Sequence, residues 1–482
     1  MYFTEITSMR YCSCSGFIVW IICSIMSLGL MFYFPGRPLE FMFIYMSFIS
    51  VLFFLITKKN KDIFEPFYLF SLYYLSLIAS SFILRLYGFE SNNFMSTVYF
   101  YNDVDDLYFI GVVSVFISYL SAWAGYSILN NKNEMPKPIE VKFIGSNYVF
   151  FIAVVFYAIG VCNFAVNIVM LYDGDLLAYY KNISMRAYDF QKSVTTLGYQ
   201  FMYVGTYIFF ISSLQKNKTS LLVFLAIIIS FLISISNGRI SQSIFYMATF
   251  FIINYYYNGK SKLNRKYVLF GAIGVLVGIS MYIFRFASSL YVNAVNDDFL
   301  LSEFINNAIN VDFLIGALFE RGNLPNFPVF LKVIDSWSND IGHMYGMTIL
   351  HPIFSFISPN VFGLVEMPAN LAKEQWYLHL PTGSLPVTGL GEMFVNFSYA
   401  GFIFGMFLFG ALGAFIRNLT VKSRSGIFLI FYAKFSIGFY MLYPKGELNN
   451  LSLFWMLFPS ISIYIIILFI KSLNKRALES RI

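Results

Sequence analysis

Long apolar stretches separated by short polar segments dominate the hydrophobic pattern of this 482-residue chain. Each stretch approaches the roughly 20 residues that an α-helix needs to cross the hydrocarbon core of a bilayer. The pattern therefore predicts an all-α, polytopic membrane protein of about 12 transmembrane helices. The predicted spans are residues 15–34, 41–57, 67–86, 108–128, 147–171, 197–214, 219–236, 240–257, 267–285, 392–416, 426–443 and 452–470.

The composition supports this interpretation. Hydrophobic residues make up 58% of the chain and charged residues only 12%, whereas a soluble domain carries about 25% charged residues to cover its surface. Lipid is therefore the expected solvent. The net charge of +7 does not indicate a nucleic-acid partner, because the basic residues gather in the predicted inner loops, where they would face anionic membrane lipids.

The distribution of basic residues predicts the orientation. With the N-terminus inside, the inner segments hold 20 Lys and Arg residues and the longer outer segments hold nine. Inner loops of membrane proteins carry the excess of positive charge. We therefore expect both termini in the cytoplasm of a bacterial inner-membrane protein. The first span ends at Pro35–Pro38 without a small-residue cleavage site, so we interpret it as an uncleaved helix.

One outer segment, residues 286–391, is far too long for a passive connection. It divides the chain into transmembrane helices 1–9 in residues 1–285, a large periplasmic loop in 286–391, and transmembrane helices 10–12 with a cytoplasmic tail in 392–482. Within the loop, residues 299–319 and 342–358 are apolar but interrupted. We expect them to form short amphipathic or re-entrant helices against the outer mouth of the bundle.

Four arginines fall on the predicted outer side, which is otherwise rich in acids: Arg239, Arg285, Arg321 and Arg186. One interpretation is that they are anchors whose aliphatic stems cover lipid-facing surface. The alternative is a cluster that binds a diphosphate, because the guanidinium fork matches phosphate oxygens and keeps its charge.

Two further side chains are candidates for acid–base chemistry. His343 lies in the segment Gly342–Gly346, whose glycines would allow the backbone to bend and expose the ring, and an imidazole can act as a general base. Glu392 opens the predicted tenth span, where an unpaired carboxylate is costly. It should pair with an outer arginine or accept the proton of a sugar hydroxyl. The alternative for His343 is an ordinary loop histidine, which is also our interpretation of His351 and His379.

Metal-binding patterns are weak. The three histidines include no pair at the i, i+4 spacing of a zinc-binding helix. Two Asp-x-Asp tripeptides on outer loops, Asp103–Asp105 and Asp173–Asp175, offer paired carboxylates for Mg²⁺, but such tripeptides are common in exposed loops. We predict no metal and no other cofactor.

The last spans carry two more signals. Lys434 lies near the middle of the predicted eleventh span, where a charged side chain is expensive and faces the bundle interior. We expect it to pair with an internal acid, with a catalytic role as the alternative. A glycine series in the tenth span indicates close helix packing; it consists of Gly401, Gly405, Gly410 and Gly413.

Three local patterns resemble the bacterial O-antigen and oligosaccharide-repeat-unit polymerases of the Wzy family. The turn Ser236–Arg239 is similar to the short Gly-Arg turn of that family. The segment Tyr345–Thr348, followed by prolines, looks like its G-x-T segment. The run Gly391–Gly401 looks like the Glu- and Asn-containing opening of one of its spans. Two departures are Ser398, where the family commonly has glycine, and the spacing of eleven residues that separates Arg186 from Gly198.

The resemblance implies a GT-C-type glycosyltransferase that needs no metal and polymerises undecaprenyl-diphosphate-linked oligosaccharides at the outer leaflet. The growing glycan would be transferred from its lipid diphosphate to a single lipid-linked repeat. Arg239, Arg285 and Arg321 would stabilise the leaving diphosphate, and Glu392 or His343 would accept the proton of the acceptor hydroxyl. The resemblance leaves open whether the protein also has a chain-length regulator as a partner.

Two other functions fit the same pattern of spans. An O-antigen ligase shares the architecture but uses a lipid A-core acceptor. A lipid-linked oligosaccharide flippase would move the substrate without chemistry, yet it needs no loop of a hundred residues and should carry charges through the bundle. The sequence favours the polymerase over both.

Overall fold

In the computed structural model, the described residues form helices joined by turns and contain no strand. The described residues are 38–57, 62–87, 104–130, 146–175, 195–216, 221–236, 240–258, 327–350, 368–376, 387–423, 425–444, 446, 457–466 and 469. The chain divides into two compact units, the first formed by residues 1–132, 315–417 and 439–450 and the second by residues 133–314, 418–438 and 451–482. Each unit is described by itself below.

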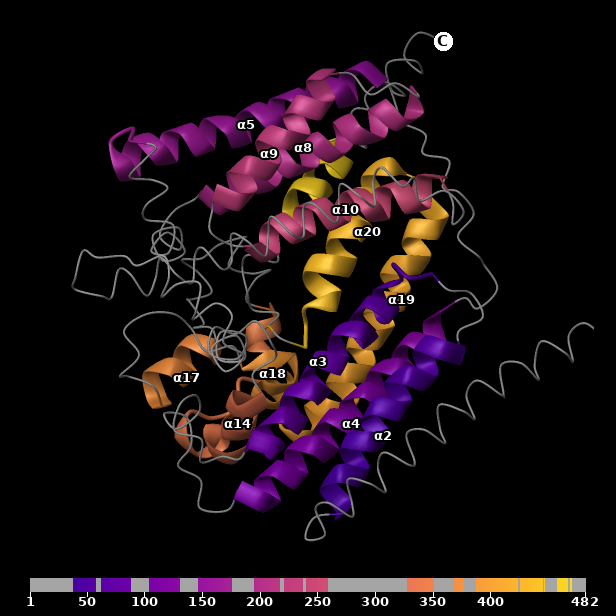
Figure 1. The fold of residues 1–482 in the computed structure, drawn as a ribbon, viewed down its shortest axis with the longest axis vertical. Coiled ribbons are helices and arrows are strands. Elements are labelled where there is room, and N and C mark those ends of the chain that lie inside the picture. Colours follow the sequence, from indigo (N-terminus) through magenta and orange to yellow (C-terminus); the bar gives the residue numbers. More distant parts are fainter. Residues whose placement is uncertain are drawn as a thin grey trace, which may run out of the picture. The chain divides into compact units, whose positions relative to one another are not determined.

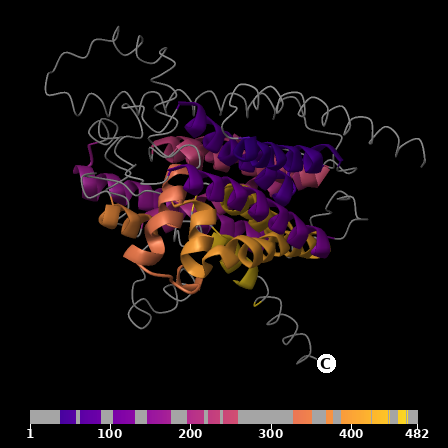
Figure 2. The ribbon, with the colours of Figure 1, turned by 90° about the horizontal axis from the view of Figure 1, so that it is seen from below.

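Long apolar helices build the first unit. Helix α2 packs against both α3 and α4, and the three lie side by side in Figures 1 and 2. The short π-helix η2 packs on α4 and leads into α19. The bounds are α2 (Pro38–Thr57), α3 (Pro66–Tyr87), α4 (Val104–Leu129), η2 (Gly401–Gly405) and α19 (Met406–Ser423). Each of the three long helices, and η2 with α19, is long and apolar enough to cross a membrane.

Buried ionic contacts join the helix ends in this unit. Glu65, just before α3, accepts a hydrogen bond from Asn130 at 3.1 Å and lies 3.5 Å from the Arg417 Nε atom. At the opposite end of α3, Arg85 forms an ion pair with Glu40 of α2 at 2.8 Å. The ends that the sequence analysis assigns to the same side of a membrane therefore lie together.

The glycine series of the predicted tenth span packs closely, as predicted. A methyl group at Gly401 would overlap the Met393 carbonyl, and one at Gly410 would overlap the Ala122 carbonyl of α4. At Gly413 it would overlap the Tyr440 ring. The absence of a side chain at these positions allows backbone and ring to approach the helix.

The second unit is built on the pair α5 and α8. Helix α8 also packs on α9 and α20, and α10 packs on α9, α8 and α20. The bounds are α5 (Ser146–Tyr172), α8 (Thr195–Gln215), α9 (Leu221–Ser236), α10 (Ile240–Asn258) and α20 (Gly426–Lys434). Helix α20 continues directly into the π-helix η3 (Phe435–Met441). Tyrosines fill the interior between α8 and α10, where Tyr207, Tyr246 and Phe250 stack edge to face or tilted.

Every predicted span that falls on described residues is largely helical there, while the spans predicted at 15–34 and 267–285 lie outside the described residues. Within the described part of the chain, five helices are long and apolar enough to cross a membrane, and three shorter apolar helices accompany them. The prediction of one continuous helix over 392–416 is wrong. The chain breaks at Ser398 and forms the short helix α18 (Thr388–Phe397) before η2 and α19.

Candidate active site

Glu392 lies on α18, and its side chain is completely buried. The break that follows α18 has a local cause, because Ser398 adopts φ 54° and ψ −149°. Such a backbone conformation is nearly restricted to glycine. The observed angles therefore explain why a glycine is expected at this position, and they show that Ser398 is strained here. Because of this break, α18, which carries Glu392, is not continuous with η2 and α19.

The loop of residues 341–346 packs against α18. Three of its residues have positive φ, namely Gly342 (93°), Tyr345 (48°) and Gly346 (86°). Two backbone amides of the loop bind α18. The Met344 N–H donates to the Val395 carbonyl at 2.9 Å, and the Gly346 N–H donates to the Asn396 side-chain oxygen at 2.9 Å. The segments Tyr345–Thr348 and Gly391–Gly401, both singled out in the sequence, are thus in direct contact.

A buried polar network joins these two segments through Glu392, Thr348 and Asn396, all of which are 0% exposed. The Asn396 amide nitrogen donates to the Thr348 hydroxyl oxygen at 2.6 Å and to the Glu392 carbonyl at 2.8 Å. The Thr348 hydroxyl in turn donates to the Glu392 carboxylate at 2.9 Å. Since each donor meets an acceptor and the three side chains are fully buried, the network specifies one relative position for loop and helix.

His343 lies on the rim of the same assembly and is half-buried. Its Nδ1 atom is 3.3 Å from the Val395 carbonyl, and its Nε2 atom is 3.2 Å from the Ser338 hydroxyl. Because a carbonyl only accepts, the Nδ1 atom must carry the hydrogen of that bond, and a neutral ring then has Nε2 as its acceptor. The arrangement orients Nε2 toward a hydroxyl group, which is the geometry that a general base requires.

Helix α14 (Phe327–Asp340) supplies Ser338 and was not predicted. Its buried face includes Phe330, Ile334 and Trp337, and the Trp337 indole donates to the Gly342 carbonyl at 2.8 Å. The neighbouring helix α17 (Pro368–Trp376) lies beside it in Figure 1. There, the Trp376 indole binds the Asp340 carboxylate at 2.7 Å. The helical spacing of the apolar residues in 327–337 was the signal that could have revealed α14.

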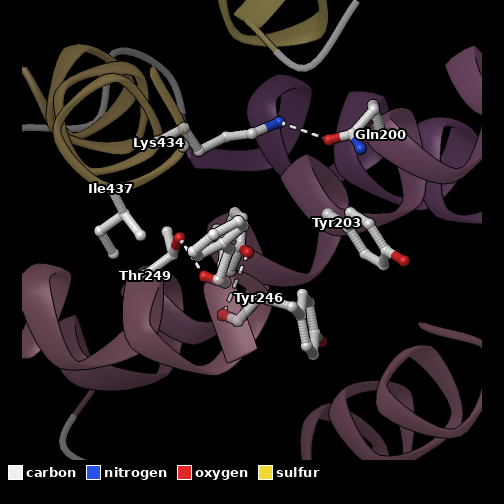
Figure 3. A pocket seen from close by; sticks show the side chains of 9 residues that line it. Gln200, Tyr203, Tyr246, Thr249, Lys434 and Ile437 are labelled. Atoms are coloured by element: carbon white, nitrogen blue, oxygen red, sulfur yellow. Dashed lines mark hydrogen bonds between the residues drawn. The ribbon is translucent and has the colours of Figure 1, made fainter. Parts of the chain in front are cut away.

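Lys434 lies in the second unit, and its predicted pairing with an internal acid is wrong for the described residues. Its ammonium donates to the side-chain oxygen of Gln200 at 3.0 Å. Figure 3 shows the two side chains reaching toward each other, with tyrosine rings beside them. The partner is an amide because α8 places Gln200, and not a carboxylate, opposite α20.

Several candidates lie outside the described residues: Arg239, Arg285, Arg321, Arg186, His351 and His379. The predicted helix at 299–319 lies outside them as well, and of the segment 342–358 the structure describes residues up to Leu350. The site described here therefore rests on His343, Glu392 and the residues that hold them.

Comparison with known proteins gives one match. The family described as O-antigen polysaccharide polymerase Wzy matches residues 17–477, which is nearly the whole chain. The searches of curated proteins and of solved structures find no match.

Proposed function

Because the chain belongs to the O-antigen polysaccharide polymerase Wzy family, we propose that it polymerises undecaprenyl-diphosphate-linked repeat units as a metal-independent GT-C-type glycosyltransferase. The family assignment and the apolar helices make it a multi-pass membrane protein of polysaccharide biosynthesis. The proposed place of the reaction is the outer leaflet of the bacterial inner membrane, with both termini in the cytoplasm.

One observation carries the proposed site. The segment Tyr345–Thr348 and the run from Gly391 are separated by some 45 residues of sequence, yet the Thr348 hydroxyl and the Glu392 carboxylate are hydrogen-bonded at 2.9 Å. The hydrogen bonds of Asn396 hold the same two segments together. A network buried to this extent presents the neighbouring His343 in a defined orientation, which supports a catalytic centre at this place.

We assign the general base to His343. The acceptor sugar hydroxyl would take a position near the Ser338 hydroxyl, within reach of Nε2. As its oxygen attacks the anomeric carbon of the donor glycan, the proton moves to Nε2 and the bond from that carbon to the lipid diphosphate breaks. The glycan is then bonded to the acceptor oxygen, and the polyprenyl diphosphate is released.

We assign Glu392 a positioning role, because its carboxylate is fully buried and bound by Thr348. Its side-chain oxygen accepts the hydrogen bond that joins loop and helix. Arg239, Arg285, Arg321 and Arg186 remain our candidates for binding the diphosphate, since guanidinium groups can stabilise its developing charge without a metal. A chain-length regulator remains a proposed partner.

The test uses purified protein, lipid-linked repeat units and gel analysis of the products, with and without a chelator. We expect His343→Gln to lower the polymerisation rate by about 100-fold or more, because general-base catalysis contributes roughly 10²–10⁴-fold. His379→Gln serves as the matched control and should polymerise normally. A His343→Gln protein that makes polymer at the wild-type rate would remove His343 from the site, and inhibition by the chelator would exclude a metal-independent reaction.

A further inference from the structure

A second buried charged group, Lys434, lies in the other unit. The side chain ends α20 and is 4% exposed. Its one described hydrogen bond goes to the Gln200 side-chain oxygen at 3.0 Å. An ammonium group carries three donors, so this contact uses one of them. Figure 3 shows that the side chain extends away from its own helix toward Gln200.

A small, partly open pocket lies beside this ammonium group. Helix α8 contributes Gln200, Tyr203 and Tyr207 to its wall, and α10 contributes Tyr246 and Thr249. From η3, Ile437 and Gly438 complete it. The π-helical turn begins directly after Lys434, and such turns within helices are frequent at functional sites. The wall thus combines a cation and an amide with aromatic side chains.

Lys434 has an amide partner and no acidic partner among the described residues around this pocket. A buried ammonium is stabilised only if an anion pairs with it, because transfer of a lone charge out of water is very unfavourable. Among the described residues, no carboxylate lines the pocket, and none forms an ion pair with Lys434. The Gln200 amide adds a donor group next to the ammonium. We propose that this pocket is an anion site that binds a single phosphate group between Lys434 and Gln200.

The size and setting of the pocket indicate how the phosphate arrives. The space suits a phosphate group better than an oligosaccharide, and the segment that carries Lys434, Gly426–Gly438, is one of the shorter apolar helices of the described chain. The phosphate is therefore carried by a lipid, and its identity as part of the polyprenyl substrate rests on the proposed function. Two other sources have the same chemistry, namely a phospholipid headgroup and free phosphate, and the experiment must separate them.

The experiment measures binding to the purified full-length chain in detergent, without turnover. The probes are farnesyl phosphate, phosphatidylglycerol and inorganic phosphate, and bound molecules are counted by native mass spectrometry and titrated by calorimetry. We expect farnesyl phosphate to bind the wild type at one Lys434-dependent site. Lys434→Met should weaken this binding about 10-fold or more, because a hydrogen bond to a charged group is lost. Lys434→Arg, which retains the charge, should bind within a few-fold of the wild type.

Gln200→Glu provides an independent variant if Lys434→Met does not fold. Its carboxylate has the shape of the original amide and would pair with Lys434 from within the protein, so farnesyl phosphate should again bind about 10-fold or more weakly. Tyr256→Phe is the matched control. It removes a hydrogen bond to Tyr432 in the same unit but outside the pocket and should bind normally.

Each result either identifies the source of the phosphate group or excludes a phosphate site at Lys434. Lys434-dependent binding of phosphatidylglycerol or inorganic phosphate in place of farnesyl phosphate would retain the phosphate site and reassign its source. Equal binding of farnesyl phosphate to the wild type, Lys434→Met and Gln200→Glu would overturn the proposal, as would the absence of binding by all three probes. Since no turnover is measured, these outcomes are independent of whether His343→Gln abolishes polymerisation.

Discussion

The two units each bury a charged side chain, and they stabilise it in different ways. In the first unit, the Glu392 carboxylate accepts a hydrogen bond from Thr348 within a network that Asn396 extends. In the second unit, the Lys434 ammonium has one described partner, the Gln200 amide, and borders a pocket. A carboxylate within a closed network holds two segments together, whereas an ammonium beside a pocket can still bind an anion. Burial of a charge alone therefore does not distinguish a structural group from a binding group.

The largest effect should come from breaking the hydrogen-bond network of Glu392, Thr348 and Asn396. Glu392→Ala removes the acceptor of the Thr348 hydroxyl and leaves a buried donor unsatisfied, which should destabilise the protein by about 1–3 kcal/mol. Polymerisation should be lost as well, because the loop that carries His343 is no longer held. Thermal unfolding in detergent and the polymerisation assay measure the two effects. Glu392→Gln, which keeps an acceptor oxygen, should retain most of both, and an equal loss in this variant would indicate that the charge itself is required.

Thr348→Val breaks the same network at its centre and should have the next largest effect. The hydroxyl that donates to Glu392 and accepts from Asn396 is lost while the side-chain shape is kept, and we expect a destabilisation of about 1–2 kcal/mol. Thr348→Ser retains the hydroxyl and is the control. Equal unfolding temperatures for Thr348→Val and the wild type would show that the network does not hold loop and helix together.

The opposite sign is expected in the second unit. Lys434→Met replaces a buried charge with an apolar side chain of similar length, and the ligand-free protein should become more stable by about 1 kcal/mol. Thermal unfolding in detergent without added phosphate measures this change. A marked loss of stability would mean that the contact between Lys434 and Gln200 is structural, and the contrast between the two units would disappear.

The smallest effect is expected at the break between α18 and η2. Ser398→Gly should stabilise the protein by about 0.5 kcal/mol, because glycine adopts the observed positive φ without the strain of a side chain but loses more backbone freedom on folding. Activity should be unchanged, since this substitution alters neither His343 nor the Glu392 network. Ser398→Ala keeps the strain and serves as the control. A lower unfolding temperature for Ser398→Gly than for the wild type would show that the serine side chain contributes a stabilising contact.

Much of the fold follows from local sequence properties. The spans at 41–57, 67–86, 108–128 and 147–171 are predictable because about 20 apolar residues in lipid can satisfy their backbone hydrogen bonds only as a helix. The glycines of the tenth span indicated close packing for a similar reason, since small side chains allow backbones to approach. The segments around Thr348 and Glu392 were also recognisable as short local patterns.

The sequence by itself thus determined the helical membrane scaffold and identified His343, Glu392 and Lys434 as unusual. Only the tertiary structure decided which groups these side chains meet: Thr348 for Glu392, Val395 and Ser338 for His343, and Gln200 for Lys434. The physical reason is that helix formation depends on neighbours along the chain, whereas hydrogen bonds between segments up to 287 residues apart depend on how helices pack. The positive φ of Ser398 likewise became visible only in the three-dimensional backbone.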